Sequence, residues 1–256
     1  MTKRHRVVDG DAHVQRASPA STSTNEDLAP PDRLAELVAG GALEAIAQPA
    51  MRLDVARWLA ALPDYRSLLE ALPASLDRES VRAFCDAQTR DADGVIATFI
   101  ASQIWGYGDR GYGPHRVAEA LACPDLVPAL QCAADDLDAG RPLDAFDALC
   151  VVFTLPNVGM SFGTKYLFFA DRHRNALILD RLVGGWLAEH TRLRLKLARH
   201  PPSYRVWLKA ASRWAVQLRT TPEKVELLIF TDALPDSSRW RAPQPSSAAR
   251  SGRASV

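Results

Sequence analysis

Apolar residues recur at helical spacing along most of this chain. Leu34, Leu37 and Val38 begin the pattern, and the apolar positions of residues 95–100 form another stripe. Residues three and four positions apart lie on one face of a helix, so these stripes predict amphipathic helices. No strand is expected, because a sustained alternation of apolar and polar residues is not evident. The pattern therefore predicts an all-α fold built from many helices.

Helix breakers divide the pattern into segments. Pro63 and Pro73 end two short apolar runs, and the pair Pro201-Pro202 separates two long ones. Asp32 is expected to cap the first helix. The further helices are expected at 53–62, 65–72, 80–87, 93–104, 117–122, 126–137, 143–155, 165–170, 181–198, 203–218 and 222–234.

The two ends of the chain differ in composition from the rest. Residues 1–31 are rich in Ser, Thr, Ala, Pro and charge, and residues 236–256 form a basic, Ser-rich end. Neither has an apolar period from which a core could be built. We therefore expect a disordered leader and a disordered basic tail around one domain, residues 32–235. No run approaches the ~20 apolar residues of a membrane span, so no membrane partner is expected.

Positive charge is concentrated in one segment of a nearly neutral chain. The formal net charge is +1, yet residues 160–219 hold twelve Lys and Arg against three acidic residues, giving 12 − 3 = +9. The remainder therefore carries 1 − 9 = −8. A basic segment of this kind is typical of a protein that binds a polyanion. The alternative, basic helix faces that are simply solvated, stays open on charge alone.

The cysteines do not indicate a metal site. The spacings of Cys85, Cys123, Cys132 and Cys150 match no metal-binding motif. Three of them stand among apolar residues of predicted helices, so we expect reduced, buried thiols. With no signal peptide in evidence, a cytoplasmic protein is expected.

Residues 104–117 combine four glycines with aromatic and basic side chains. Trp105, Tyr107 and Tyr112 alternate with the glycines, and Arg110 and Arg116 flank them. Aromatic rings and arginines on a flexible backbone suit stacking on a base or holding a DNA strand. Alternatively, the segment is a tight corner whose aromatic rings fill the core.

The stretch 156–186 collects the residues best suited to chemistry. A glycine-bearing turn from Asn157 to Gly163 supplies backbone N–H groups that could bind a phosphate. Lys165 stands at the start of the apolar helix that follows, and Asp180 stands directly before the next helix. Taken singly, each has an ordinary explanation: a turn, a solvated lysine and a helix N-cap.

Together these residues resemble the helix-hairpin-helix DNA glycosylases, and in particular the 8-oxoguanine DNA glycosylases and their bacterial OGG-fold relatives. The run Phe162-Gly163-Thr164-Lys165 is similar to the Gly-Thr-Lys end of the family's hairpin. The run Ile178-Leu179-Asp180 is similar to the context of its catalytic aspartate. The chain departs from the pattern in two ways: the two candidates are 180 − 165 = 15 residues apart, slightly fewer than usual, and Asn157 or Ser161 stands where a glycine is usual. The resemblance covers about residues 95–232 and implies a two-lobed helical fold.

The resemblance implies a base-excision repair enzyme whose partner is double-stranded DNA containing a damaged base. By position, Lys165 would attack the sugar at C1′ and Asp180 would be the supporting carboxylate. The damaged nucleotide would be flipped out of the stack. The Schiff base left by the amine would permit strand cleavage, so the expected activity is that of a glycosylase and AP lyase on an oxidised purine such as 8-oxoguanine.

The remaining predicted site residues would hold the DNA. Trp105, Tyr107 and Tyr112 are the candidates for the purine pocket. The candidates for contacts to the DNA backbone are Gly159, Ser161, Gly163, Thr164, Arg181, Arg110 and Arg116.

Two other interpretations stay open. A helix-hairpin-helix protein that binds DNA without cutting a glycosidic bond would leave Lys165 exposed, and the altered hairpin favours it. A helical protein-interaction domain would scatter its basic residues over the surface. No cofactor is expected, because the lysine chemistry requires no metal and no cysteine for an iron–sulfur cluster follows Cys150. We expect a monomer in the cytoplasm, associated with the nucleoid.

Overall fold

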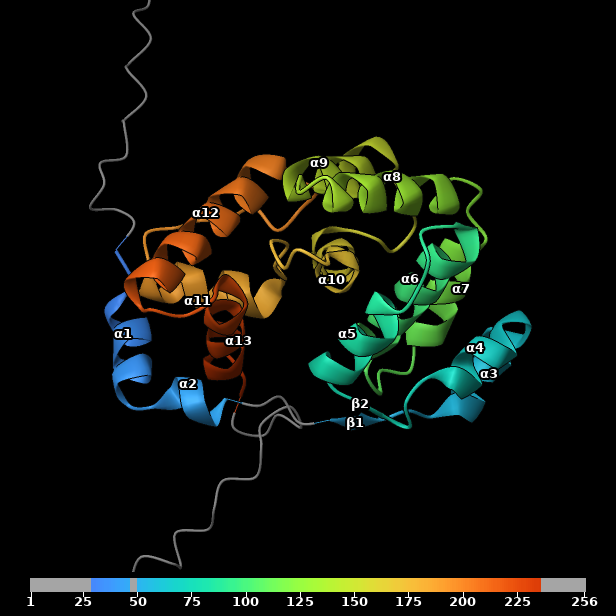
Figure 1. Ribbon diagram of the computed structural model, residues 1–256, viewed down its shortest axis with the longest axis horizontal. Coiled ribbons are helices and arrows are strands. Elements are labelled where there is room, and N and C mark those ends of the chain that lie inside the picture. The colour runs from blue at the N-terminus through green and yellow to red at the C-terminus, as the bar shows by residue number, and fades with distance from the viewer. Residues whose placement is uncertain (1–28, 47–49, 236–256) are drawn as a thin grey trace, which may run out of the picture.

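The computed structural model describes residues 29–46 and 50–235 and confirms the all-α fold class (Figure 1). Within these residues the strands are limited to Met51–Arg52 (β1) and Ser75–Leu76 (β2), which pair antiparallel. The predicted leader, apart from residues 29–31, and the predicted tail lie outside the described residues. Asp32 is the first residue of the first helix and not its cap, because Pro31 occupies the N-cap position.

The helices follow one another along the described chain with short connections. Their bounds are α1 Asp32–Ala39, α2 Ala42–Ala45, α3 Val55–Ala61, α4 Arg66–Ala71, α5 Arg78–Asp86, α6 Ala92–Tyr107, α7 Gly113–Leu121, α8 Leu126–Asp138, α9 Pro142–Asp147, α10 Met160–Ala170, α11 Arg181–His190, α12 Pro201–Gln217 and α13 Pro222–Asp232. A 3-10 turn, η2, covers Pro63–Tyr65, and a π-helical turn, η3, covers Ala148–Val152.

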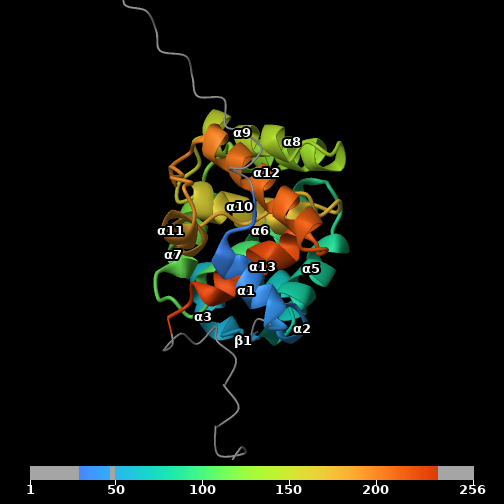
Figure 2. The ribbon, with the colours of Figure 1, turned by 90° about the vertical axis from the view of Figure 1, so that its left-hand side faces the viewer.

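The helices form two lobes, as expected (Figure 1). One lobe contains α3 to α8. The other combines α11, α12 and α13 with α1 and α2, so that the beginning and the end of the described chain share a lobe. Figure 2, which faces that lobe, shows α1 and α13 side by side. α10 lies between the lobes and packs against α5, α6, α8 and α9.

α6 and α10 form the centre of the core. Both are apolar on nearly every face, which is typical of helices surrounded by other elements. Gly163 allows α10 to approach η3, since a β-carbon there would lie 2.3 Å from the Cys150 sulfur. Gly106 likewise allows α6 to approach α10, since a β-carbon there would lie 2.7 Å from Cδ of Lys165. The two central helices therefore meet at the candidate lysine.

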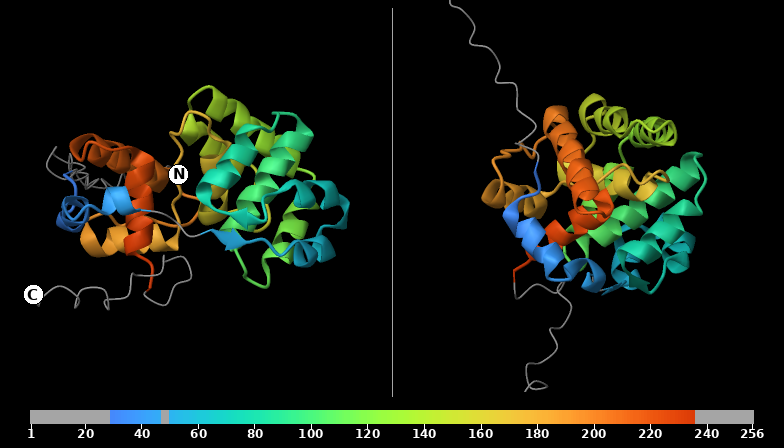
Figure 3. Two further views of the ribbon diagram at one scale, coloured as in Figure 1. Left: turned by 60° about the horizontal axis from the view of Figure 1, so that its bottom comes forward. Right: turned by 60° about the vertical axis from the view of Figure 1, so that its left-hand side comes forward.

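Three predicted boundaries near the candidate site are wrong. The predicted helix 143–155 is α9 followed by η3, and it stops before the turn at Pro156. α10 begins at Met160, so Lys165 lies in its second turn and not at its start. The predicted helix 181–198 ends at His190, and residues 191–200 form an irregular connection. Figure 3 shows this connection between the gold α11 and the orange α12.

The cysteines only partly follow the expectation of buried thiols. Cys85 and Cys150 are buried, and burial raises the pKa of each thiol to about 12. Cys123 is half-buried, and Cys132 is exposed on α8, because it falls on the helix face opposite the core. In the described part of the chain no group of three or more possible metal ligands is found. No single helix there is long and apolar enough to cross a membrane, and α7 with α8 passes that test only as a pair bent by 91°.

Candidate active site

The turn before α10 has the features of a type II turn. Pro156 is followed by Asn157, whose φ is 58°, and the Val158 N–H donates to the Leu155 carbonyl at 3.5 Å. The third residue of such a turn needs a positive φ, which glycine and asparagine tolerate best. The Asn157 side chain also donates to Glu119 at 2.7 Å. Asparagine is thus compatible with the tight turn for which a glycine is usual.

The turn is shorter than predicted, and this changes which N–H groups are available. α10 has Gly159 as its N-cap residue, with no side chain capping it. Gly163 is buried, and its N–H donates to the Gly159 carbonyl at 2.7 Å, so it cannot bind a phosphate. The first N–H groups of a helix have no intrahelical partner. The phosphate-binding groups of this region would therefore be those of Gly159, Met160 and Ser161.

Thr164 ties α10 to the segment that precedes α11. Its hydroxyl donates to the Met160 carbonyl at 2.7 Å and accepts the Leu179 N–H at 3.0 Å. Since Thr164 and Leu179 directly precede Lys165 and Asp180, this bond fixes the relative position of the two candidate catalytic residues. Thr164 is completely buried and cannot reach DNA, contrary to the predicted contact.

Lys165 and Asp180 form a buried ion pair. The lysine Nζ lies 3.0 Å from Oδ2 of Asp180, and the two residues are 6% and 9% exposed. The Nζ also donates to Oγ of Ser161 at 3.1 Å and to its carbonyl at 3.3 Å. A non-catalytic DNA-binding protein was expected to leave Lys165 exposed. That expectation does not match its burial.

The two carboxylate oxygens of Asp180 have different partners. Oδ1 caps α11 by accepting the N–H groups of Leu182 at 3.0 Å and Val183 at 3.2 Å, while Oδ2 faces Lys165. Burial by itself raises the pKa of this carboxyl group. The charge of Lys165 and the hydrogen bonds from Lys165, Val183 and Leu182 outweigh burial, so the pKa of Asp180 lies below its usual value. Asp180 is therefore a carboxylate at neutral pH.

Two neighbours of Lys165 were not predicted as part of the site. The Phe162 ring centroid lies 5.4 Å from the lysine Nζ, and the ring stacks on Tyr107 with centroids 4.0 Å apart. Gly106 packs directly against the lysine stem. The helical spacing of three between Phe162 and Lys165 could have indicated the first neighbour. The second depends on how α6 and α10 meet, which no local pattern records.

The aromatic candidates separate into buried and exposed residues. Trp105 and Tyr107 are 2% and 1% exposed, and Trp105 packs edge-on against Phe169 with centroids 5.1 Å apart. These two rings fill the core at the end of α6, which was the alternative explanation for them. Tyr112 is 48% exposed, with Arg116 stacked over its ring at 4.4 Å.

The predicted arginines all lie at the surface. Arg110 and Arg116 are exposed around the connection between α6 and α7. Arg57 of α3 fixes this connection by donating to the carbonyl of Asp109 at 2.8 Å and to that of Arg110. Arg181, also exposed, begins α11 directly after Asp180.

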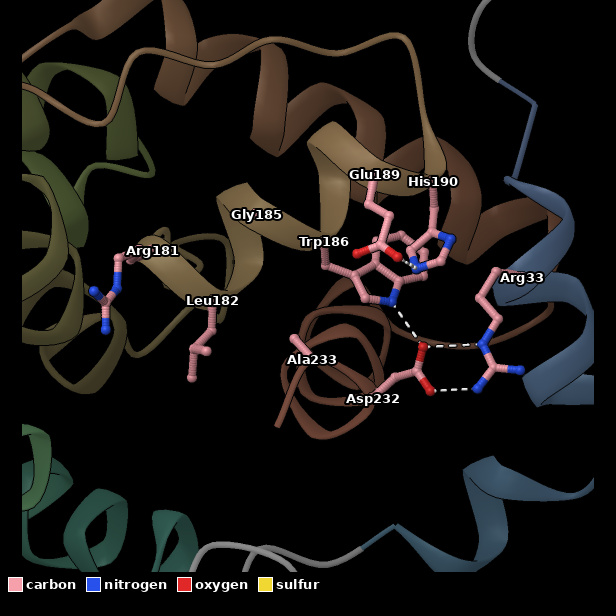
Figure 4. A pocket seen from close by; sticks show the side chains of 9 residues that line it. All are labelled: Arg33, Arg181, Leu182, Gly185, Trp186, Glu189, His190, Asp232 and Ala233. Carbon is pink, nitrogen blue, oxygen red and sulfur yellow. Dashed lines mark hydrogen bonds and ion pairs between the residues drawn. The ribbon is translucent and has the colours of Figure 1, made fainter. Parts of the chain in front are cut away.

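A groove of 710 Å³ lies beside α11, α13 and α1 (Figure 4). Arg181 and Leu182 line one end, next in sequence to Asp180. At the other end Asp232 accepts the Trp186 indole N–H at 2.8 Å and two hydrogen bonds from Arg33 at 3.0 and 2.6 Å. The side chain of Arg181 extends away from this cluster. An enzyme was expected to hold Lys165 and Asp180 a few ångströms apart at the floor of a cleft. The two are 3.0 Å apart, but they do not line this groove.

Comparison with protein families identifies the family of the chain. Residues 44–230 match a family model described as "Putative 8-oxoguanine DNA glycosylase OGG-like protein". The chain belongs to this OGG-like family. The match includes the turn, Lys165 and Asp180, and membership of the OGG-like family implies DNA as the partner. The chain matches no curated protein and no solved structure.

Proposed function

We propose that the protein is a DNA glycosylase and AP lyase that removes an oxidised purine such as 8-oxoguanine. The buried ion pair of Lys165 and Asp180 is the observation that carries the proposal. Burying an ammonium group is costly unless it is paired and hydrogen-bonded, and most surface lysines are neither. An amine held 3.0 Å from a carboxylate, within a segment that matches the OGG-like family, suits a nucleophile.

In the proposed reaction the damaged nucleotide leaves the base stack and its sugar approaches Lys165. The Nζ gives up a proton and attacks C1′. The bond from C1′ to the base breaks, and its electron pair leaves with the base, which takes up a proton. The C1′–O4′ bond then breaks, a proton moves from Nζ to O4′, and an imine forms between Nζ and C1′. Loss of a C2′ proton from this imine forms a C2′–C3′ double bond and expels the 3′ phosphate, which cleaves the strand.

Asp180 is assigned to charge stabilisation. Its pKa lies below the usual value, so it remains negatively charged and is a poor permanent acceptor of a proton. A fixed carboxylate stabilises the positive charge that develops on a sugar when its bond to the base breaks. Its hydrogen bonds to the start of α11 hold it in place without loss of that charge.

The surface residues are assigned to the DNA. The turn before α10 and the uncapped start of α10, including Ser161, would bind a backbone phosphate. Tyr112, Arg110, Arg116 and Arg181 would contact the strand or the flipped base, whereas the buried Tyr107 would support Phe162 and the buried Trp105 would pack against Phe169. A monomer in the cytoplasm, associated with the nucleoid, remains part of the proposal.

Single-turnover base release tests the proposal. Duplexes carrying one 8-oxoguanine, another oxidised purine or no lesion are incubated with wild type and Lys165→Gln. Release of a damaged purine by wild type alone is the expected result. If wild type binds every duplex and releases nothing, the protein is a helix-hairpin-helix DNA-binding protein.

A further inference from the structure

The connection between α11 and α12 alternates basic and apolar residues. Arg192, Arg194 and Lys196 alternate with Leu193 and Leu195. The burial follows the same alternation: the three basic residues are exposed, and the two leucines are partly buried against the core. Alternate side chains of an extended chain point to opposite sides. The leucines thus hold the segment down while the basic side chains face outward.

We call residues 192–199 the basic strap. The Lys196 N–H donates to the buried hydroxyl of Ser203 at 2.9 Å, which fastens the strap to the start of α12. At the end of the strap, Arg199 donates to the Leu155 carbonyl at 2.6 Å. That carbonyl also closes the turn before α10. The strap and the turn are therefore parts of one surface.

The basic strap also lies against the helix that begins at Asp180. Leu197 packs on Gly184, where a β-carbon would lie 2.8 Å from each Cδ of the leucine. The Gly184 N–H donates to the Asp180 carbonyl at 2.9 Å, so this contact is one helical turn from the candidate site. In Figure 4 the chain after His190 runs back along α11.

Along the sequence, the charged residues of the segment that contains the basic strap are all positive. No acidic residue occurs between Glu189 and Glu223, and eight Lys and Arg occur in that interval. Two residues of extended chain span about 6.6 Å, so basic residues at every second position are expected to recur at about that spacing. Nη1 of the middle one, Arg194, also donates to the carbonyls of Thr191 at 2.8 Å and Leu193 at 3.3 Å. A regular row of positive charges fits the regular row of phosphates along one DNA strand.

We propose that the basic strap binds the sugar–phosphate backbone of DNA beside the damaged nucleotide. The strap would extend the phosphate contact of the turn before α10 along the same strand. Because its backbone is already fastened at Ser203 and Leu155, little chain entropy would be lost when DNA binds. The inference rests on DNA binding by the OGG-like family and does not require the lysine chemistry.

The test is the salt dependence of binding to an undamaged duplex. Wild type is compared with the triple variant R192Q/R194Q/K196Q by titration at several salt concentrations. Each lost phosphate contact reduces the steepness of log K against log salt by about 0.9, so a reduction of about 2 to 3 is expected. Melting temperature should change little, because the replaced side chains are exposed. If the triple variant does not fold, Arg192→Gln and Lys196→Gln are measured singly, with a reduction of about 0.9 expected for each.

A charge-matched control separates a local contact from a general effect of net charge. The variant R66Q/R141Q/K224Q also removes three positive charges, from exposed positions on other elements. Its slope should stay close to that of wild type. Equal slopes for the strap variant and the control would overturn the inference. Because the duplex is undamaged, this outcome does not depend on base release. If the strap variant has a reduced salt slope but wild type releases no damaged base, the inference about the basic strap holds and the proposed glycosylase activity is rejected.

Discussion

The described residues contain two buried ion pairs, Lys165–Asp180 and Arg78–Glu226, and the cations of the two pairs differ in their chemistry. Lys165 meets Asp180 between α10 and the start of α11, with a nitrogen–oxygen distance of 3.0 Å. Arg78 meets Glu226 between α5 and α13 through two hydrogen bonds, one of them 3.1 Å long. Arginine keeps its proton at any pH that a protein survives, whereas a lysine can release its proton and become a nucleophile. One pair suits chemistry and the other suits structure.

The surroundings of Arg78 support a structural role. Its guanidinium lies 5.4, 5.2 and 5.5 Å from the ring centroids of Trp105, Phe168 and Phe230. Glu226 is completely buried, and α5 and α13 belong to different lobes. This pair therefore joins the two lobes.

The pKa values of the two carboxyl groups are shifted in opposite directions. Burial raises the pKa of Glu226, because complete desolvation outweighs the attraction of Arg78. Burial also acts on Asp180, yet its pKa is lowered, because two backbone N–H groups at a helix start add to the charge of Lys165. Helix capping therefore adds to the ion pair with Lys165 in keeping Asp180 charged.

The largest effect is expected for replacement of Lys165, which should nearly abolish base release while the protein still folds. Lys165→Gln should reduce the single-turnover rate of base release by about 10³-fold or more, as when other enzymes lose a nucleophile. Glutamine leaves Asp180 without its cation, but the N–H groups of Leu182 and Val183 still bind its carboxylate, so the variant should fold and lose less stability than one that breaks the Arg78–Glu226 pair. A variant that retains base release would remove Lys165 from the mechanism.

Arg78→Met should show the opposite behaviour. It leaves Glu226 buried without its cation, which typically costs about 3–5 kcal/mol of unfolding free energy. The measurement is urea unfolding, with the double variant R78M/E226L as control. The double variant should recover much of the loss, because an apolar pair leaves no charge unpaired. Equal destabilisation by the single and double variants would contradict the structural role.

Asp180→Asn should make stability less dependent on pH. The folded-state pKa of Asp180 is below its unfolded value of about 3.9, so its stabilisation is present above that pH and is lost as the pH falls through the folded pKa. Asparagine still caps a helix, so the variant should fold. The gap in unfolding free energy between wild type and variant should be widest near pH 7 and narrow below pH 4. A gap that does not vary with pH would mean that Asp180 acts only as a cap.

Gly106→Ala should have the smallest effect. The new β-carbon would lie 2.7 Å from Cδ of Lys165, a flexible stem that can move aside, so the rate should fall about tenfold with little change in melting temperature. Gly111→Ala is the matched control, because a β-carbon there meets nothing within 4 Å. Equal rates for the two variants would mean that the position of Lys165 is not set by α6.

The sequence predicted the fold class and indicated the two candidate catalytic residues, which lie together in the structure. The helical period gave the helices, and Lys165 and Asp180 were identified through a family resemblance rather than through any local pattern. The contact between Lys165 and Asp180 depends on Thr164, whose hydroxyl accepts the N–H of Leu179, a residue 15 positions later in the sequence.

The errors have two physical causes. Trp105 and Tyr107 were interpreted as possible surface aromatics, but whether a ring lies inside or outside depends on tertiary packing around α6. The helix predicted at 181–198 overlooked the alternation from Arg192 to Leu197, which is a period of two and places the leucines on one side only if the chain is extended.

Borohydride trapping on a duplex with a single 8-oxoguanine tests the role of Lys165 most directly. Borohydride reduces an imine between a lysine and C1′ to a stable amine, and peptide mapping of the product locates the modified residue. We predict a covalent adduct with wild type, located at Lys165, and none with Lys165→Gln. An adduct that persists in Lys165→Gln, or that maps to another lysine, would contradict the assignment of Lys165 as the nucleophile.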